Sequence, residues 1–147
     1  PAVGVSNLAA VAQAVLARDT ATTHVLVCND ARMKEVYTAL FRRDEAGLAA
    51  LEGRERVMQP ASVELPPSAG NAVRRVMGAG RGFRAYPQLV DRLRGELVAI
   101  DDAILPAAGE IAVLAAAAFR AGEAVAPELL QPVYLRDEVA VPAAGHG

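Results

Sequence analysis

Residues 24–43 read HVLVCNDARMKEVYTALFRR, two apolar runs separated by a short polar stretch. The run from His24 to Asn29 is too brief for a helix, and the run from Glu35 to Arg43 is apolar on both faces. Strands with two apolar faces are covered on both sides, so we expect this pair in the middle of a sheet. A hairpin with its turn at 30–34 is the shortest connection between them.

Helices are expected on both sides of this hairpin in the chain. Before it, Ser6 or Asn7 can cap a helix, because apolar residues at helical spacing follow them. Polar and β-branched residues from Thr20 end this helix. After it, Asp44 to Glu55 is polar and contains glycine, which favours a loop. The remaining elements that we expect are strands at 56–63, 74–77 and 96–100, a surface connector at 65–70, and helices at 87–94 and 106–122. The fold class is therefore α/β or α+β, a mixed sheet with flanking helices.

The composition fits one folded domain. The chain has 147 residues, of which 53% are hydrophobic and 22% charged, and this balance excludes a wholly disordered protein. Its formal net charge of −2 provides no overall field that would attract nucleic acid. The single cysteine, Cys28, excludes an internal disulfide, and no apolar run approaches the ~20 residues of a membrane span. We expect a cytoplasmic protein that does not enter a membrane.

Residue types that carry chemistry are few. His24 and His146 are the only histidines and lack the spacing of a zinc site, so we expect His24 to be a partly buried strand residue. Cys28 lies in an apolar strand, where a thiol is usually inert, and Ser6 is better explained as a helix cap than as a nucleophile. The residues therefore predict no catalytic group and no metal ligand.

One glycine cluster stands out, GAGRG at 78–82. Its small residues after a strand would let a phosphate approach the backbone at Gly78 and Gly80. The cluster lacks the Lys-Ser/Thr of a P-loop and the full dinucleotide-binding spacing. A tight turn is the simpler interpretation.

Arginine is concentrated in one segment. Between residues 74 and 94 lie six arginines and one acid, with Phe83 and Tyr86 among them, which is the composition of an RNA-contacting surface. The alternative is a solvated face without a nucleic-acid role. The candidate RNA contacts are Arg74, Arg75, Arg81 and Arg84.

Three stretches taken together resemble one family. They are GVSNLAAVAQ at 4–13, DARMKEVY at 30–37 and PVYLR at 132–136. In this order and spacing they are similar to the TsaB (YeaZ) family of bacterial tRNA threonylcarbamoyladenosine biosynthesis proteins. Two weaker matches lie between them, at 76–87 and 105–108.

The resemblance implies a fold of the actin/sugar-kinase/chaperone-ATPase type, which is built from two RNase H-like lobes. Residues 1–140 would form the second (C-terminal) lobe and 141–147 a flexible tail, and the first lobe would be absent from this chain. The sequence departs from the family at Lys34, where glycine is frequent, and matches it poorly over 60–72. Without the first lobe, we expect the helix after Ser6 and the two-sided strands to expose an apolar patch that promotes self-association.

The resemblance also implies a function. Such a chain would be a noncatalytic partner of a TsaD-like catalytic paralogue and a TsaE-like ATPase, and it would meet tRNA through their complex. No cofactor is implied for this lobe, although ATP or ADP would belong to the assembled complex. The alternative is a nucleotide-using or hydrolytic enzyme of the same fold, as the older name glycoprotease suggests. The best-matched internal motif offers Asp30, Arg32, Glu35 and Tyr37 as binding residues.

Overall fold

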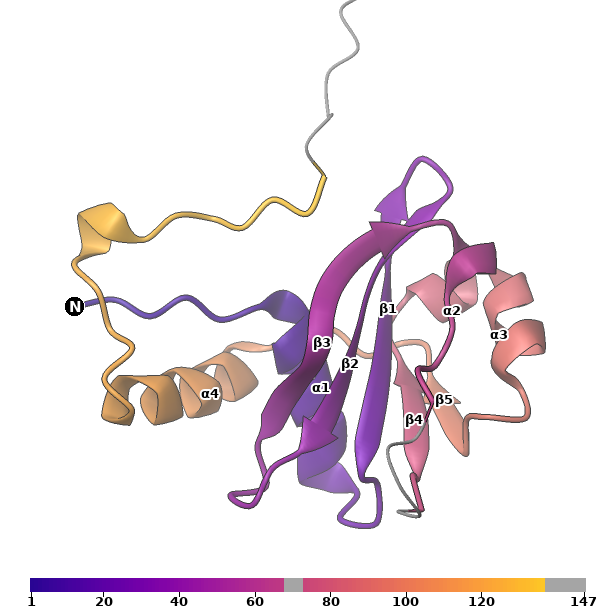
Figure 1. Cartoon of the computed structure of the whole chain (residues 1–147), viewed down its shortest axis with the longest axis horizontal. Helices are drawn as coiled ribbons and strands as arrows, with labels where there is room; N and C mark the ends of the chain where they lie inside the picture. The colour runs from indigo at the N-terminus through magenta and orange to yellow at the C-terminus, as the bar shows by residue number, and fades with distance from the viewer. Residues whose placement is uncertain (68–72, 137–147) are drawn as a thin grey trace, which may run out of the picture.

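A five-stranded mixed sheet, with strand order β3-β2-β1-β4-β5, forms the centre of the molecule (Figure 1). The structure is a computed structural model that describes residues 1–67 and 73–136. β1 pairs antiparallel with β2 and parallel with β4, so the predicted hairpin and the predicted mixed sheet are both confirmed. The strands are β1 (His24–Arg32), β2 (Glu35–Arg43), β3 (Ala49–Met58), β4 (Val76–Ala79) and β5 (Ala99–Asp101).

Helices cover both faces of the sheet. Val25 and Val27 of β1 pack with α1 on one face, whereas Leu26 and Cys28 pack with α2 and α3 on the other. This alternation confirms that the two apolar faces of β1 are both buried and that β1 is central. The helices are α1 (Asn7–Arg18), α2 (Gly82–Ala85), α3 (Pro87–Leu93) and α4 (Ala108–Arg120), with short 3-10 turns η1 (Pro60–Ser62) and η2 (Pro127–Leu129).

The C-terminal end of α1 is capped by a side chain from β2. The Arg43 guanidinium donates from Nη2 to the carbonyl oxygens of Leu16 at 2.7 Å and Asp19 at 2.8 Å, and from Nε to the carbonyl of Thr22 at 3.2 Å. These carbonyls belong to the last turn of α1 and the residues that follow it, where a helix leaves acceptors unpaired. A cation there also complements the helix dipole.

The turn between β1 and β2 is strained. Arg32, Met33 and Lys34 all have positive φ angles, of 63°, 51° and 62°. This left-handed conformation is costly for residues with a Cβ atom and is easy for glycine. A glycine at position 34, which the family resemblance implies, would adopt this conformation without that cost.

The bounds of the third strand differ from the sequence-based prediction. A loop was expected over 44–55 and a strand over 56–63, but β3 covers Ala49–Met58 and stops before Pro60, which opens η1. β3 is an outer strand with mostly exposed or half-buried side chains, so it lacks a clear apolar alternation. It also contains Gly53, with a φ of +86°, where its pairing with β2 shifts register. An irregular edge strand of this kind resembles a loop in sequence.

Smaller boundaries also differ. β4 begins at Val76 rather than at residue 74, β5 begins at Ala99 rather than at 96, and the last helix begins at Ala108 rather than at 106. The four-residue α2 was not predicted. The expected tail at 141–147, with His146, lies outside the described residues, as does part of the connector at 65–70.

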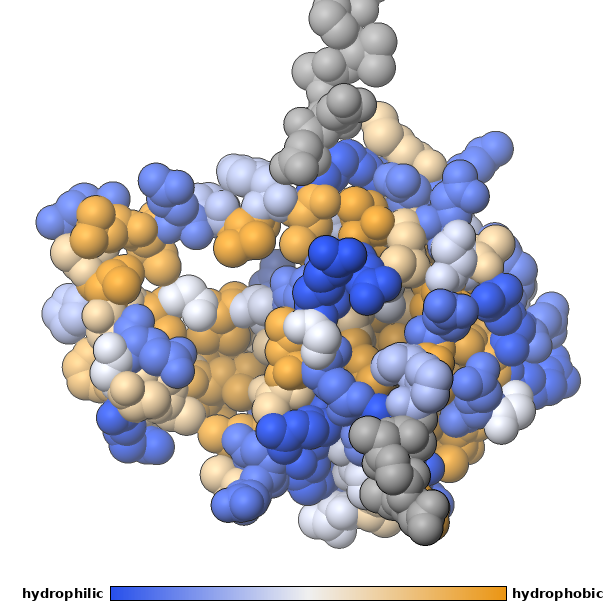
Figure 2. Space-filling view, in the orientation of Figure 1, coloured by the Kyte–Doolittle hydropathy of each residue, from blue (hydrophilic) through white to orange (hydrophobic). Residues whose placement is uncertain are grey.

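Exposed apolar side chains lie on α4 and after it rather than on α1. Eight residues of α1 are buried, and the sheet is covered on both faces, so the expectation of an uncovered first helix is wrong. In contrast, α4 buries none of its residues, and Val113 and Phe119 are about half exposed. Figure 2 shows apolar side chains over this part of the molecule. Two backbone hydrogen bonds between Ala2 and Val125, of 2.7 and 2.9 Å, hold the N-terminal segment beside the chain that follows α4.

Candidate functional site

A cleft of about 950 Å³ lies where the carboxyl end of β1 meets the N-terminus of α1. The two ends meet because the turn at 19–23 reverses the chain, so that β1 runs antiparallel to α1. Residues 4–8 form one wall, the β1–β2 hairpin and β3 form the floor, and residues 130–136 complete the lining. Its polar side chains include Ser6, Asn7, Asn29, Asp30, Tyr37 and Glu55.

Ser6 joins α1 to β3 at the wall of this cleft. Its Oγ accepts a hydrogen bond from the Leu8 amide at 3.1 Å, which confirms the predicted N-cap. Its hydroxyl donates to the carboxylate of Glu55. The contact with Glu55 spans 49 residues of sequence, and no local motif in the sequence indicated it.

Asp30 organises the floor of the cleft. Its Oδ1 accepts from the Tyr86 hydroxyl at 3.0 Å and from the Arg32 amide at 2.9 Å, and its Oδ2 lies 3.8 Å from the Arg32 guanidinium. The pKa of Tyr86 is raised, first because the phenol is withdrawn from water and then because it donates to Asp30. Tyr86 was predicted only as part of an RNA-contacting surface, whereas the structure uses it to hold the hairpin.

Glu35 lies at the rim and pairs with Arg136, 101 residues away. Of the four predicted binding residues, Asp30 and Tyr37 line the cleft, while the Arg32 side chain is 89% exposed. The structure therefore brings Asp30, Glu35 and Tyr37 to one place and leaves the Arg32 side chain in solvent. Arg136 belongs to the PVYLR stretch that carried the family resemblance, which was the signal that could have identified it.

The glycine cluster is explained by close packing. A Cβ atom on Gly80, whose φ is +106°, would lie 2.4 Å from Asn29 Oδ1 and 2.6 Å from the Cys28 carbonyl oxygen. A Cβ atom on Gly78 would lie 2.9 Å from Phe83 Cζ. Both glycines are buried, so packing against β1 and α2 is sufficient to require them. A phosphate contact at these glycines stays a prediction.

The candidate RNA-contacting arginines do not form one surface. Arg74 and Arg75 precede β4, whereas Arg81 and Arg84 follow it, so the two pairs lie at opposite ends of the strand. Arg74 pairs with the Glu52 carboxylate and donates to the Pro66 carbonyl at 2.7 Å, and its side chain is largely buried. Arg84 donates to Asp102 at 2.8 Å. RNA contact through these arginines stays a prediction.

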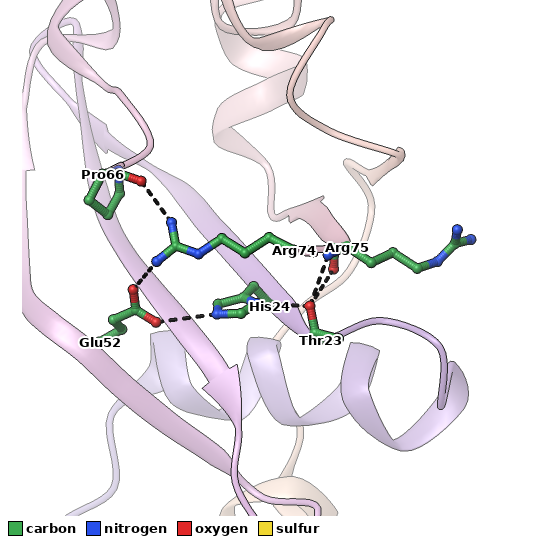
Figure 3. A network of polar contacts seen from close by, with 6 residues as sticks. All are labelled: Thr23, His24, Glu52, Pro66, Arg74 and Arg75. Atoms are coloured by element: carbon green, nitrogen blue, oxygen red, sulfur yellow. Dashed lines mark hydrogen bonds and ion pairs between the residues drawn. The ribbon is translucent and has the colours of Figure 1, made fainter. Parts of the chain in front are cut away.

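His24 belongs to a polar network that joins three parts of the sheet (Figure 3). Its Nε2 lies 3.3 Å from Glu52 Oε2 on β3, and its Nδ1 lies 2.8 Å from Thr23 Oγ1. Arg74 pairs with the same carboxylate, and Arg75 donates its amide to Thr23. Burial lowers the pKa of His24, and this effect exceeds the attraction of Glu52. The predicted partly buried histidine is confirmed.

Cys28 is fully buried in β1, and burial raises the pKa of its thiol to about 12. The predicted buried strand position is confirmed, and the raised pKa is in line with an inert thiol, because the thiolate is the reactive form. Over 1–67 and 73–136, no group of three or more His, Cys, Asp or Glu side chains is placed to hold a metal ion. The helices in these ranges are all too short or too polar to cross a membrane.

Comparisons with known proteins agree with this fold. No family model matches the chain. It is similar to the tRNA threonylcarbamoyladenosine biosynthesis protein TsaB of Escherichia coli (strain K12), with 37% identity over 142 residues, which cover 95% of this chain and 59% of the relative. Two solved structures from Pseudomonas aeruginosa, one of YeaZ and one of a protein with similarity to peptidase YEAZ, superpose with TM-scores of 0.77 and 0.78 at 36% and 37% identity.

Each of these structures is matched over 92% of this chain and 59% of its own length. The mixed sheet with helices on both faces is therefore a fold that this chain shares with part of the YeaZ structures. Over the residues that align, the chain is similar in both sequence and fold to the TsaB (YeaZ) proteins. It spans about three fifths of the length of the relatives that it matches.

Proposed function

We propose that this chain is the second lobe of a subunit that supports the biosynthesis of threonylcarbamoyladenosine in tRNA. The observation that carries the proposal is its 37% identity to TsaB across 95% of the chain. The similarity to the YeaZ structures extends over almost the same residues, so sequence and fold support the same family.

The subunit acts as a partner rather than as the catalyst. Three side chains that could serve as nucleophile or base are engaged in structural roles instead. Cys28 is buried with a pKa of about 12, Ser6 caps α1, and His24 is held between Thr23 and Glu52. These contacts support a noncatalytic role, in which the subunit holds a TsaD-like paralogue and a TsaE-like ATPase in a working complex. tRNA, and ATP or ADP, are then bound by the complex.

Reconstitution of tRNA modification tests this role. The full-length protein is added to, or left out of, a mixture of tRNA, TsaD-like and TsaE-like proteins and a threonylcarbamoyl-AMP source. We expect modification to depend on the full-length protein and the full-length protein alone to produce none. Full modification in its absence would reject the proposal, and so would substrate turnover by the purified protein alone. Calorimetry with ATP on the same protein tests the nucleotide-using alternative.

A further inference from the structure

Residues 130–136, here called the strap, line one side of the cleft. They run as an extended segment beside the N-terminal segment (Figure 1). Among the described residues, no backbone hydrogen bond joins 131–136 to the rest of the molecule. Val133 and Tyr134 in the middle of the strap are 82% and 75% exposed. The strap is therefore not held as a strand or a helix, and its attachment depends on its two ends.

The near end of the strap is fixed by backbone contacts. The Leu130 amide donates to the Pro127 carbonyl at 3.2 Å in η2, and the paired amides of Ala2 and Val125 anchor the chain just before it. A Cβ atom on Gly4 would lie 3.3 Å from Leu130 Cδ1, so the N-terminal segment also contacts this end. These contacts fix the chain up to Leu130, so a movement of the strap would begin at this residue.

Among the residues that the structure describes, the side-chain hydrogen bonds and the ion pair at the far end all come from Arg136. The Arg136 guanidinium pairs with the Glu35 carboxylate, and its Nη1 lies 3.5 Å from Met33 Sδ. The Arg136 side chain is 14% exposed and that of Glu35 is 32% exposed, so the pair is only partly shielded from water. Because about one third of the Glu35 side chain is exposed to water, salt weakens this pair.

We propose that the strap is a gate, with its pivot at Leu130 and the Arg136–Glu35 pair as its latch. When the latch breaks, the strap swings away and opens the cleft to molecules that contact Asn29, Asp30 and Tyr37. Because the strap shares no backbone hydrogen bonds with the sheet, it opens while the rest of the fold stays intact. This inference concerns the chain by itself and is independent of the proposed role in tRNA modification.

Trypsin cleavage after Arg136 tests the gate in the complete 147-residue chain. Trypsin must take the arginine side chain into its own pocket, so cleavage requires the latch to be open. Glu35→Gln removes the charge of the latch and keeps the shape of the side chain. Glu45→Gln, at an exposed position in the β2–β3 turn, is the matched control. A small peptide substrate corrects for the effect of salt on trypsin itself.

We expect Glu35→Gln to be cleaved after Arg136 at least fivefold faster than the parent chain, and Glu45→Gln to match the parent. Raising NaCl from 50 to 500 mM, a range over which exposed ion pairs are progressively screened, should accelerate cleavage of the parent more than that of Glu35→Gln. Equal cleavage of the parent and Glu35→Gln at low salt would overturn the proposal.

A second measurement does not depend on the protease. In ¹⁵N-labelled protein, Arg136→Ala should shift the amide signals of Asn29 and Tyr37 in the cleft, while Arg120→Ala at the end of α4 should leave them unchanged. Unchanged signals in both variants would show that the strap does not close the cleft.

Discussion

The cap that Arg43 places on α1 gives the sharpest prediction about stability. Arg43→Met keeps most of the apolar stem but removes three hydrogen bonds to the carbonyls of Leu16, Asp19 and Thr22. Hydrogen bonds from a charged donor contribute about 1.5–3 kcal/mol each when buried. The Arg43 site is only partly buried, and water can replace part of this set. We therefore expect a loss of about 3 kcal/mol in the free energy of unfolding, including ~0.5 kcal/mol from the helix dipole.

Urea denaturation followed by far-ultraviolet circular dichroism measures this loss. With a slope of about 2 kcal/mol per molar urea for a chain of this size, the midpoint should fall by about 1.5 M. Arg43→Lys should recover only part of the loss, because a single ammonium group cannot reach three carbonyls in the arrangement that the planar guanidinium allows. Arg42→Met, at the exposed neighbouring position, is the control and should change stability by less than about 0.5 kcal/mol. A loss below about 1 kcal/mol for Arg43→Met, or an equal loss for Arg42→Met, would refute the capping argument.

Three further predictions concern the turn, the histidine and the glycine cluster. Lys34→Gly should raise the free energy of unfolding by about 0.5–1 kcal/mol in urea melts, because glycine adopts the left-handed backbone conformation of position 34 without the cost that a Cβ atom brings. A decrease in the free energy of unfolding would show that the backbone at this position is not strained. An NMR titration should give His24 a pKa below its ordinary value of 6.5. The free energy of unfolding should then decline as the pH falls below 6.5, because the unfolded state binds the proton more readily than the folded state does. A raised pKa of His24 would contradict this prediction, because the free energy of unfolding would then increase as the pH falls. Gly80→Ala should lower the free energy of unfolding by more than about 3 kcal/mol. Gly95→Ala should not lower it, because a Cβ atom added at Gly95 would have no neighbouring atom within 4 Å. Equal losses in the two variants would argue against the packing explanation.

The parts of the fold that the sequence predicted are those with strong local patterns. The two apolar faces of the β1–β2 hairpin were visible in the sequence, and so was the serine that caps α1. β3 was missed because an edge strand buries little, and its polar residues and bulged glycine carry no periodic signal. Propensity and periodicity describe neighbours in the chain, and β3 is defined by its pairing with β2.

The candidate site was predicted only in part for the same reason. Asp30, Glu35 and Tyr37 lie close together in the hairpin motif, and the structure places them around one cleft. Their partners Glu55, Tyr86 and Arg136 come from distant parts of the chain and were not assigned to that site. The arginine-rich segment shows the reverse relation, since Arg74 and Arg75 are close to Arg81 and Arg84 in sequence but lie at the other end of β4.

The charged outer strand has a consequence for the behaviour of the molecule in solution. β3 presents the exposed Arg54 and Arg56 along the free border of the sheet, together with a kink at Gly53. Another copy that tried to extend the sheet there would have to strip water from these ions and match an irregular backbone. We therefore expect the border that was hardest to recognise in the sequence to disfavour the growth of the folded protein into fibrils.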